Sequence, residues 1–123
     1  MNILLDTHAF LWATYKDKRV TRKLIDLMES NQLYLSSISC FEIQQKRYVG
    51  KLSRDPRYQD LFESGDLIEL PFKSSHAERT FQLPLIHRDP FDRMLIAQSM
   101  VEGIPLVTAD KTIQQYDFEF IAV

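Results

Sequence analysis

The stretch Asn2-Ile3-Leu4-Leu5-Asp6-Thr7-His8 shows the pattern on which the fold of this chain depends. The short apolar run Asn2–Leu5 is typical of a buried strand, and apolar residues at helical spacing between His8 and Tyr15 predict a helix behind it. The same order, a strand and then a helix, recurs to the end of the chain, and no Asn-Gly or Asp-Gly dipeptide marks a hairpin turn. Alternating strands and helices without hairpins predict parallel βα units, and hence an α/β fold.

The sequence patterns divide the chain into four to five strands and six helices. The expected strands cover residues 2–5, 33–35, 67–70, 104–107 and 118–123. The expected helices cover residues 8–15, a segment capped by Thr21, residues 39–49 with a stop at Gly50, a segment from Asp55-Pro56 to Gly65, residues 74–81, and a segment from Asp89-Pro90 to Gly103. The last helix is apolar around most of its circumference, which predicts burial on several sides.

The size and composition of the chain favour one globular domain over residues 1–123. Cys40 is the only cysteine, so no disulfide can form within the chain, which fits a reducing cytosol. No apolar run approaches the roughly 18–20 residues that a membrane span requires. The N-terminus also lacks the basic start and the long apolar stretch of a signal peptide. We therefore expect a cytoplasmic protein without a membrane partner.

The net charge of −2 does not by itself indicate a nucleic-acid-binding protein, but the basic residues are clustered. One cluster is Lys16, Lys18, Arg19, Arg22 and Lys23, and the other is Lys46, Arg47, Lys51, Arg54 and Arg57. Solvated helix faces explain each cluster taken alone. Beside an acidic metal site, the same side chains would contact the phosphates on either side of a cleaved bond.

Four acidic residues lie directly after a predicted strand or in the first turns of the helix that follows one: Asp6, Glu42, Asp92 and Asp110. The carboxyl ends of parallel strands share one edge of a sheet, where open α/β folds bind their ligands. Carboxylates gathered there would repel each other by about 4 kcal/mol per close pair at an effective dielectric constant near 20. A cation such as Mg²⁺ or Mn²⁺ removes that repulsion and is a usual means of cleaving phosphodiesters. The pattern therefore predicts a small metal-dependent nuclease.

The neighbours of these acids support an oxygen-rich site. Thr7 follows Asp6, and Thr108 precedes Asp110 by two positions, so both hydroxyls could orient a carboxylate or a water. The three histidines, His8, His76 and His87, lack the spacing of a zinc site. Of these, His8 is the candidate for a substrate contact because it is close to Asp6, although a structural role explains it as well.

Each acid also has a purely structural explanation. Asp6 could cap the helix beginning near His8, and Asp110 could cap the short turn from Lys111 to Gln115. Glu42 could complete a capping box that starts at Ser39. Asp92 could be a first-turn acid that the helix dipole favours. Each explanation suffices for one residue, but none accounts for four acids arriving at one edge of one sheet.

Four stretches of the chain occur in an order and a spacing that resemble one protein family. They are Asn2-Ile3-Leu4-Leu5-Asp6-Thr7-His8, Ser36-Ser37-Ile38-Ser39-Cys40-Phe41-Glu42-Ile43, His87-Arg88-Asp89-Pro90-Phe91-Asp92-Arg93-Met94-Leu95-Ile96-Ala97 and Leu106-Val107-Thr108-Ala109-Asp110. Together they resemble the PIN domain, and in particular the VapC-type toxins of bacterial toxin–antitoxin pairs. The resemblance covers essentially the whole chain, and the segment from His87 to Arg93 is its most distinctive part.

The resemblance implies a PIN-like three-layer α/β sandwich, with a central, mostly parallel sheet of four to five strands flanked by helices. It also implies a Mg²⁺- or Mn²⁺-dependent endoribonuclease that hydrolyses RNA phosphodiester bonds. The partners that it implies are an RNA substrate, a cognate antitoxin protein that holds the toxin inactive, and a second copy of the chain in a homodimer. By residue-to-residue match, the catalytic and metal-site residues would be Asp6, Glu42, Asp92 and Asp110.

Two other functions compete with this interpretation. A phosphoacceptor signalling domain also gathers carboxylates around Mg²⁺, but it would need paired acids after the first strand, where this chain has only Asp6. A PIN-like module that binds RNA or a partner without cleavage would be expected to lack one of the four acids. Asp89 is a separate case: we expect it to cap the helix that begins at Pro90, and Arg93 could reach back to pair with it.

Overall fold

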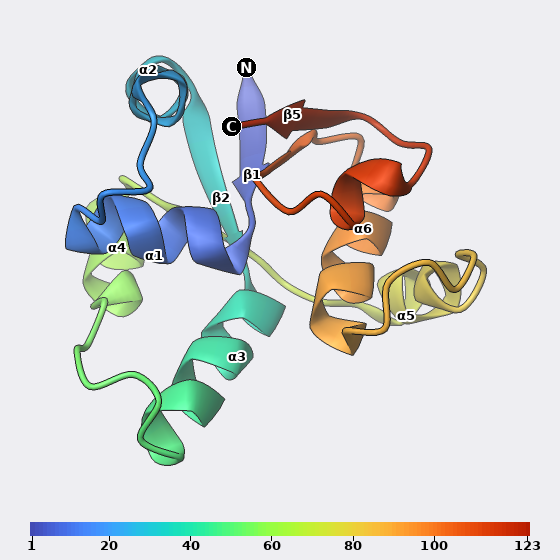
Figure 1. Cartoon of the computed structure of the whole chain (residues 1–123), viewed down its shortest axis with the longest axis horizontal. Coiled ribbons are helices and arrows are strands. Elements are labelled where there is room, and N and C mark those ends of the chain that lie inside the picture. The colour runs from blue at the N-terminus through green and yellow to red at the C-terminus, as the bar shows by residue number, and fades with distance from the viewer.

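Strand β1 (Asn2–Leu5) lies at the centre of a sheet of five parallel strands. The computed structural model describes all residues from 1 to 123. The order of the strands across the sheet is β3-β2-β1-β4-β5 (Figure 1). The prediction of four to five mostly parallel strands is therefore confirmed, and every neighbouring pair is in fact parallel. The remaining strands are β2 (Gln32–Ser36), β3 (Ile68–Leu70), β4 (Leu106–Thr108) and β5 (Phe120–Ala122).

Six α-helices and one short 3₁₀ helix connect the strands. All six expected helices are present, with ends that differ from the predicted ones by up to three residues. None of them combines the length and the apolar character needed to cross a bilayer. The helices are α1 (Thr7–Tyr15), α2 (Arg22–Ser30), α3 (Ser37–Tyr48), α4 (Tyr58–Ser64), α5 (Ser74–Thr80) and α6 (Pro90–Glu102), and the 3₁₀ helix is η1 (Ile113–Gln115).

Side chains on the two faces of the sheet belong to two separate hydrophobic cores. In β1, Ile3 and Leu5 point to a core that α1, α2, α3 and α4 share, whereas Leu4 points to a core formed with α6 and η1. This alternation follows from the period of two along a strand. Full burial of each such side chain contributes roughly 1.5–3 kcal/mol. The sheet thus has helices on both faces, which confirms the three-layer sandwich.

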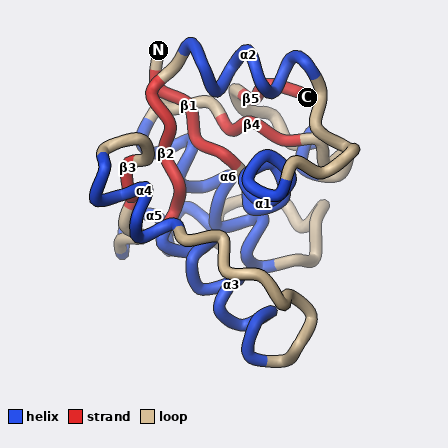
Figure 2. The backbone as a smooth tube through the Cα atoms, turned by 90° about the vertical axis from the view of Figure 1, so that its left-hand side faces the viewer, coloured by secondary structure: helices blue, strands red, loops and turns tan.

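Helix α3 lies beneath the carboxyl ends of β1 and β2 (Figure 2). It follows β2 without a loop, because Ser36 ends the strand and also caps the helix through a 3.0 Å bond from the Ile38 N–H to its Oγ. Helix α3 packs against both α1 and α6, which come from opposite sides of the sheet. The first turns of these three helices therefore surround the edge at which the strands end.

The beginnings of two helices differ from the predicted ones. The capping box from Ser39 to Glu42 is wrong, because α3 begins earlier and Ser36 is its cap. Asp55-Pro56 does not begin α4: Asp55 Oδ1 accepts the N–H of Arg57 at 2.9 Å, and Arg57 itself takes up a left-handed φ of 57° before the helix starts at Tyr58. Asp55 thus forms a local turn instead of the helix cap that the Asp55-Pro56 sequence predicts.

Helix α6 begins and ends as the sequence predicts. Asp89 Oδ1 accepts the N–H groups of Phe91 at 2.8 Å and Asp92 at 3.4 Å, and Gly103 ends the helix with a φ of 66°. The expected pairing of Arg93 with Asp89 is wrong. Arg93 instead donates from Nη2 to the carbonyl oxygens of Thr80 and Leu83, at 3.2 and 3.3 Å, because these carbonyls are within reach at and just after the end of α5.

Candidate functional site

Asp6 lies at the junction of β1 and α1 and is 3% exposed. Its Oδ1 accepts the N–H of Ala9 at 2.7 Å, so Asp6 is the N-cap of α1. Burial raises the pKa of its carboxyl above the ordinary value, although a hydrogen bond from the Thr108 hydroxyl and the N–H of Ala9 both oppose the rise. The nearby Asp110 carboxylate adds to the rise. The capping role is therefore real, and it fixes the carboxylate at the edge of the sheet.

Asp92 lies in the first turn of α6 and is also buried, at 9% exposure. Burial, which is the largest cause, and the negative charges of four other acids together raise the pKa of its carboxyl to about 8. Charge repulsion of this kind acts between groups that lie near one another. The four acids that repel Asp92 are, in order of decreasing effect, Asp89, Glu42, Asp110 and Asp6. The structure thus brings all four predicted site residues into one cluster, with Asp89 beside them.

Glu42 faces this cluster from the second turn of α3. It is 6% exposed, and its Oε1 is buried without any hydrogen-bond partner. Its Oε2 lies 3.5 Å from Nζ of Lys46, one turn further along the helix. A buried carboxylate oxygen without a donor loses its hydration at a cost of several kcal/mol unless a cation is present.

Asp110 follows β4. It caps the next turn of the chain and also belongs to the acidic cluster. Its Oδ1 accepts the N–H groups of Thr112 and Ile113, at 2.8 and 3.0 Å, which confirms the predicted capping of the turn. Its own N–H donates to Oγ1 of Thr108 at 3.0 Å. The Thr7 hydroxyl is used differently, since it donates to Ser39 Oγ at 2.8 Å and fastens the start of α1 to α3.

His87 belongs to the cluster and was missed by the sequence analysis. Its Nε2 lies 2.9 Å from Asp92 Oδ2 and 3.6 Å from Asp110 Oδ2. Its Nδ1 accepts the N–H of Asp89 at 3.2 Å, so the neutral ring carries its proton on Nε2, facing the two carboxylates. A search for paired metal-binding histidines could not find it, but its position two residues before the helix cap Asp89 could have placed it at this edge.

The donor set fits a hard divalent cation better than zinc. Carboxylate oxygens converge from Asp6, Glu42, Asp92 and Asp110, whereas the one histidine presents an N–H rather than a free lone pair. His87, Asp92 and Asp110 each place one atom within 4.8 Å of the others. The unpartnered Glu42 Oε1 and the mutual repulsion are both relieved by positive charge at this point. These residues can therefore hold an ion such as Mg²⁺ or Mn²⁺.

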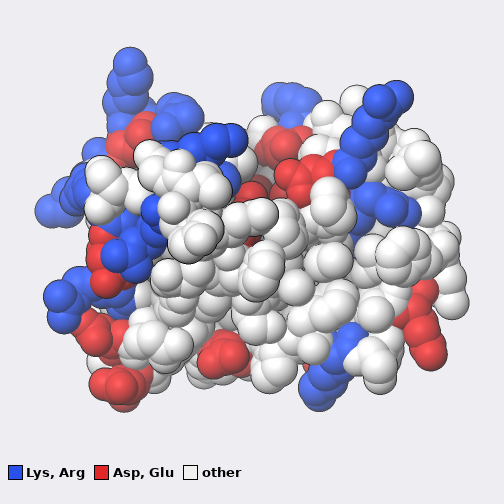
Figure 3. All heavy atoms as spheres, turned by 90° about the horizontal axis from the view of Figure 1, so that it is seen from below, with Lys and Arg blue, Asp and Glu red and all other residues white.

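The surface around the cluster has mixed charge. Figure 3 shows the face toward which the carboxyl ends of the strands point, with acidic atoms recessed near its centre and basic atoms on both sides of them. His8 is exposed on α1, where its ring stacks on Trp12 at 6.1 Å, and its charge lowers the pKa of Asp6. Burial raises the pKa of the Cys40 thiol to about 12, which keeps the thiol protonated and unreactive at neutral pH.

The raised pKa of Asp92 predicts a stability change with pH in the absence of metal. The carboxyl is protonated in the folded state up to about pH 8 but ionises near 3.8 when unfolded. Its contribution to the free energy of unfolding is thus complete below about pH 4 and is lost as pH rises to 8, by at most about 1.4 kcal/mol per unit. Urea unfolding of wild type and Asp92→Asn in chelator should show the wild type losing stability relative to the variant over this range. If the stabilities of the wild type and the variant changed with pH in the same way, this prediction would be contradicted.

A parallel sheet with a group of carboxylates at its carboxyl edge defines an α/β sandwich with a candidate metal centre. Two of the carboxylates lie on helices α3 and α6, one is the N-cap of α1, and one lies in the loop after β4. The family model described as the PIN domain matches residues 3–119. The chain therefore belongs to the PIN domain family, as the resemblance in the sequence implied. A search of curated proteins finds no significant match to the chain.

Solved structures of toxin–antitoxin complexes share this fold. The chain is similar to one in VapBC2 from Rickettsia felis bound to a promoter DNA fragment, with 20% identity, a TM-score of 0.72, and coverage of 98% of this chain and 97% of the other. A chain of DNA-bound VapBC from Salmonella typhimurium has 20% identity, a TM-score of 0.70, and coverage of 98% and 96%. A chain of FitAcB from Neisseria gonorrhoeae has 16% identity and a TM-score of 0.66, and the match covers 98% of this chain and 96% of the other.

Proposed function

We propose that this protein is a Mg²⁺- or Mn²⁺-dependent endoribonuclease and the toxin of a type II toxin–antitoxin pair. The observation that carries the proposal is the convergence of Asp6, Glu42, Asp92 and Asp110, whose mutual repulsion contributes to a pKa of about 8 for Asp92. These four residues are the proposed catalytic and metal-binding residues. Such a cluster stores repulsion that a divalent cation relieves, which a packed core alone would not require.

The residues of the cluster would hold the cation from several elements of the fold. Asp6 is rigid because it caps α1, and Asp92 is rigid because it lies in the capped first turn of α6. Glu42 offers the unpartnered Oε1 from a third element. The bound ion would lower the pKa of a water and neutralise the charge that develops on the phosphate. Thr108 and Thr7 hold β4 and α3 in place around these ligands.

His87 lies beside the carboxylates of Asp92 and Asp110. Its Nε2–H faces Asp92 Oδ2 and Asp110 Oδ2, while Nδ1 is tied to the backbone of Asp89. The ring is held through Nδ1, and its Nε2 lies beside the carboxylates without a hydrogen-bond partner, where it could orient them as outer residues do in metal sites. This N–H also provides positive potential near the position at which an RNA phosphate would bind.

An antitoxin protein is the proposed partner, and a homodimer the proposed assembly. The support for the antitoxin is that similar chains were solved in VapBC and FitAcB complexes. A basic side chain of an antitoxin, such as arginine, could enter the acidic cluster, pair with its carboxylates and displace the metal. We place the protein in the cytoplasm, where its RNA substrate and such a partner would be made.

Metal-dependent cleavage by the purified protein tests the proposal. RNA should be cut in Mg²⁺ or Mn²⁺, remain intact in excess chelator, and be cut again when metal is restored, because carboxylate oxygens bind these hard ions. Thermal melting gives a second measurement: metal should raise the melting temperature of the wild type, since an ion that binds only the folded state stabilises it. Full cleavage in chelator would rule the mechanism out. A metal-independent melting temperature would show that no ion binds at the cluster.

A further inference from the structure

Tyr116, at the end of η1, reaches from the core to the loop that carries His87. Only 3% of this tyrosine is exposed, and its ring belongs to the core formed by one face of the sheet, α6 and η1. Its hydroxyl oxygen accepts the N–H of His87 at 2.8 Å and the N–H of Ile86 at 3.1 Å. The N–H of Ile86 also donates to the carbonyl oxygen of Pro84, so the bond to His87 is the main link. The hydroxyl of a buried tyrosine usually finds such a partner, and here the partner is the backbone beside the acidic cluster.

The loop between α5 and α6, residues 81–89, has little apolar packing to hold it in place. Leu83 is buried in the same core as Tyr116, but the side chains of residues 84–86 and of Arg88 are all exposed. A segment with few buried apolar contacts opens locally at a low free-energy cost. The position of the second half of this loop therefore depends on its hydrogen bonds, and chiefly on those to Tyr116.

A series of hydrogen bonds runs through this loop from Asp110 to Asp92. Asp110 accepts two N–H groups at the start of η1, and Tyr116 at the other end of η1 accepts the N–H of His87. His87 Nδ1 in turn accepts the N–H of Asp89, whose side chain caps the first turn of α6, where Asp92 lies. The two elements that present these carboxylates are thus tied together through Tyr116 and His87. The Nε2 of His87 lies between them, 2.9 Å from Asp92 Oδ2 and 3.6 Å from Asp110 Oδ2.

We propose that Tyr116 is a positioning residue of the acidic cluster, because its hydroxyl holds the loop backbone so that the His87 ring stays beside Asp92 and Asp110. Tyr116 contacts neither the carboxylates nor a substrate and acts only through His87. This inference rests on the proposed function of the cluster and adds to it a residue from the opposite end of η1. Tyr116→Phe is a specific probe, since it removes the hydroxyl and leaves the ring in the core.

Amide hydrogen exchange in chelator tests the contact itself. In Tyr116→Phe the amide of His87 loses its acceptor and should exchange faster than in the wild type, whereas amides in the middle of α6 should stay protected. The matched control is Tyr58→Phe: Tyr58 is also buried, but its hydroxyl accepts Nε2 of Gln44 at 2.8 Å and joins α4 to α3. The control should leave exchange at His87 unchanged. An unchanged rate at His87 in Tyr116→Phe would overturn the proposal.

Mn²⁺ binding, measured by calorimetry, tests whether Tyr116 acts through His87. His87→Ala should weaken binding about 10-fold, and Tyr116→Phe about 3-fold or more, as expected when residues that support metal ligands are replaced. The double variant should bind Mn²⁺ no more weakly than His87→Ala alone, because without the ring there is nothing for the hydroxyl to position. If the two losses multiplied in the double variant, Tyr116 would have a structural role independent of His87, and the proposal would be wrong.

RNA cleavage separates this proposal from the ribonuclease function. At a Mn²⁺ concentration near the wild-type Kd, Tyr116→Phe should have a lower kcat, because fewer molecules hold the ion. Its KM for RNA should stay near the wild-type value, because the buried hydroxyl does not contact RNA, and Tyr58→Phe should cleave as the wild type does. If the wild type binds Mn²⁺ but cleaves no RNA, the ribonuclease function fails, and the binding comparison still decides the role of Tyr116. If Tyr116→Phe binds Mn²⁺ and cleaves RNA as the wild type does, the Tyr116 proposal fails alone.

Discussion

Replacing Asp92 by asparagine is expected to lower the rate of metal-dependent RNA cleavage by more than about 100-fold. That figure is the upper end of the loss seen when a residue that supports a metal ligand is replaced, and Asp92 is proposed to be a ligand itself. The variant should still fold and should melt at a higher temperature than the wild type in chelator. The reason is that Asp92 is repelled by Asp89, Glu42, Asp110 and Asp6, and asparagine of the same shape removes that repulsion. Loss of activity together with a gain in stability is the signature of a functional charge.

The matched control is Asp89→Asn, three residues earlier in the same segment. Asp89 caps α6 through bonds to the N–H groups of Phe91 and Asp92, and asparagine caps a helix about as well as aspartate. This variant should therefore keep the fold and most of the activity. Both measurements, melting curves and RNA cleavage, can be made on the two proteins side by side. An inactive Asp89→Asn beside an active Asp92→Asn would show that the third acid was assigned to the wrong residue.

The sheet could be predicted because each strand carries its own signal. Apolar runs such as Ile3–Leu5 and Leu106–Val107 are buried on both faces, which leaves a continuous apolar segment in the sequence. Helix ends were less predictable. The turn before α4 depends on Arg57 in a left-handed conformation, which an arginine does not signal in advance. Arg93 found carbonyl acceptors at the end of α5, a contact that exists only once the two helices pack.

The site was predictable to the extent that topology determines it. Asp6 and Asp110 follow strands, so a parallel sheet places them at one edge whatever their side chains do. His87 was not predictable in this way, because it lies in a loop and approaches Asp92 only through its bond to the backbone of Asp89. The unpartnered Oε1 of Glu42 likewise depends on packing of α3 against α6, which the sequence does not encode locally.

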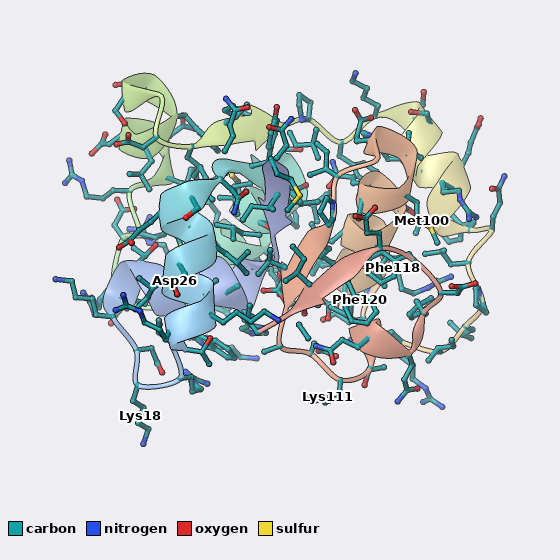
Figure 4. All side chains as sticks on the ribbon, turned by 90° about the horizontal axis from the view of Figure 1, so that it is seen from above. Lys18, Asp26, Met100, Lys111, Phe118 and Phe120 are labelled. Carbon is teal, nitrogen blue, oxygen red and sulfur yellow. The ribbon has the colours of Figure 1, made fainter.

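Asp6→Asn is expected to abolish growth arrest in cells that express this chain without an antitoxin. Asparagine can accept the N–H of Ala9 as Asp6 does, so α1 keeps its cap, but the cluster loses one carboxylate and with it the affinity for metal. The matched control is Asp26→Asn, because Asp26 on the surface of α2 (Figure 4) pairs only with Arg22, at 3.1 Å. That pair is exposed, so its loss should change stability by less than about 1 kcal/mol and leave toxicity intact.

The measurement is the growth rate after induction. The amount of each protein is measured as well, so that a lack of toxicity is not caused by a lack of protein. Wild type and Asp26→Asn should both slow growth, whereas Asp6→Asn at the same level should not. Growth arrest by Asp6→Asn equal to that of the wild type would separate toxicity from cleavage at the cluster.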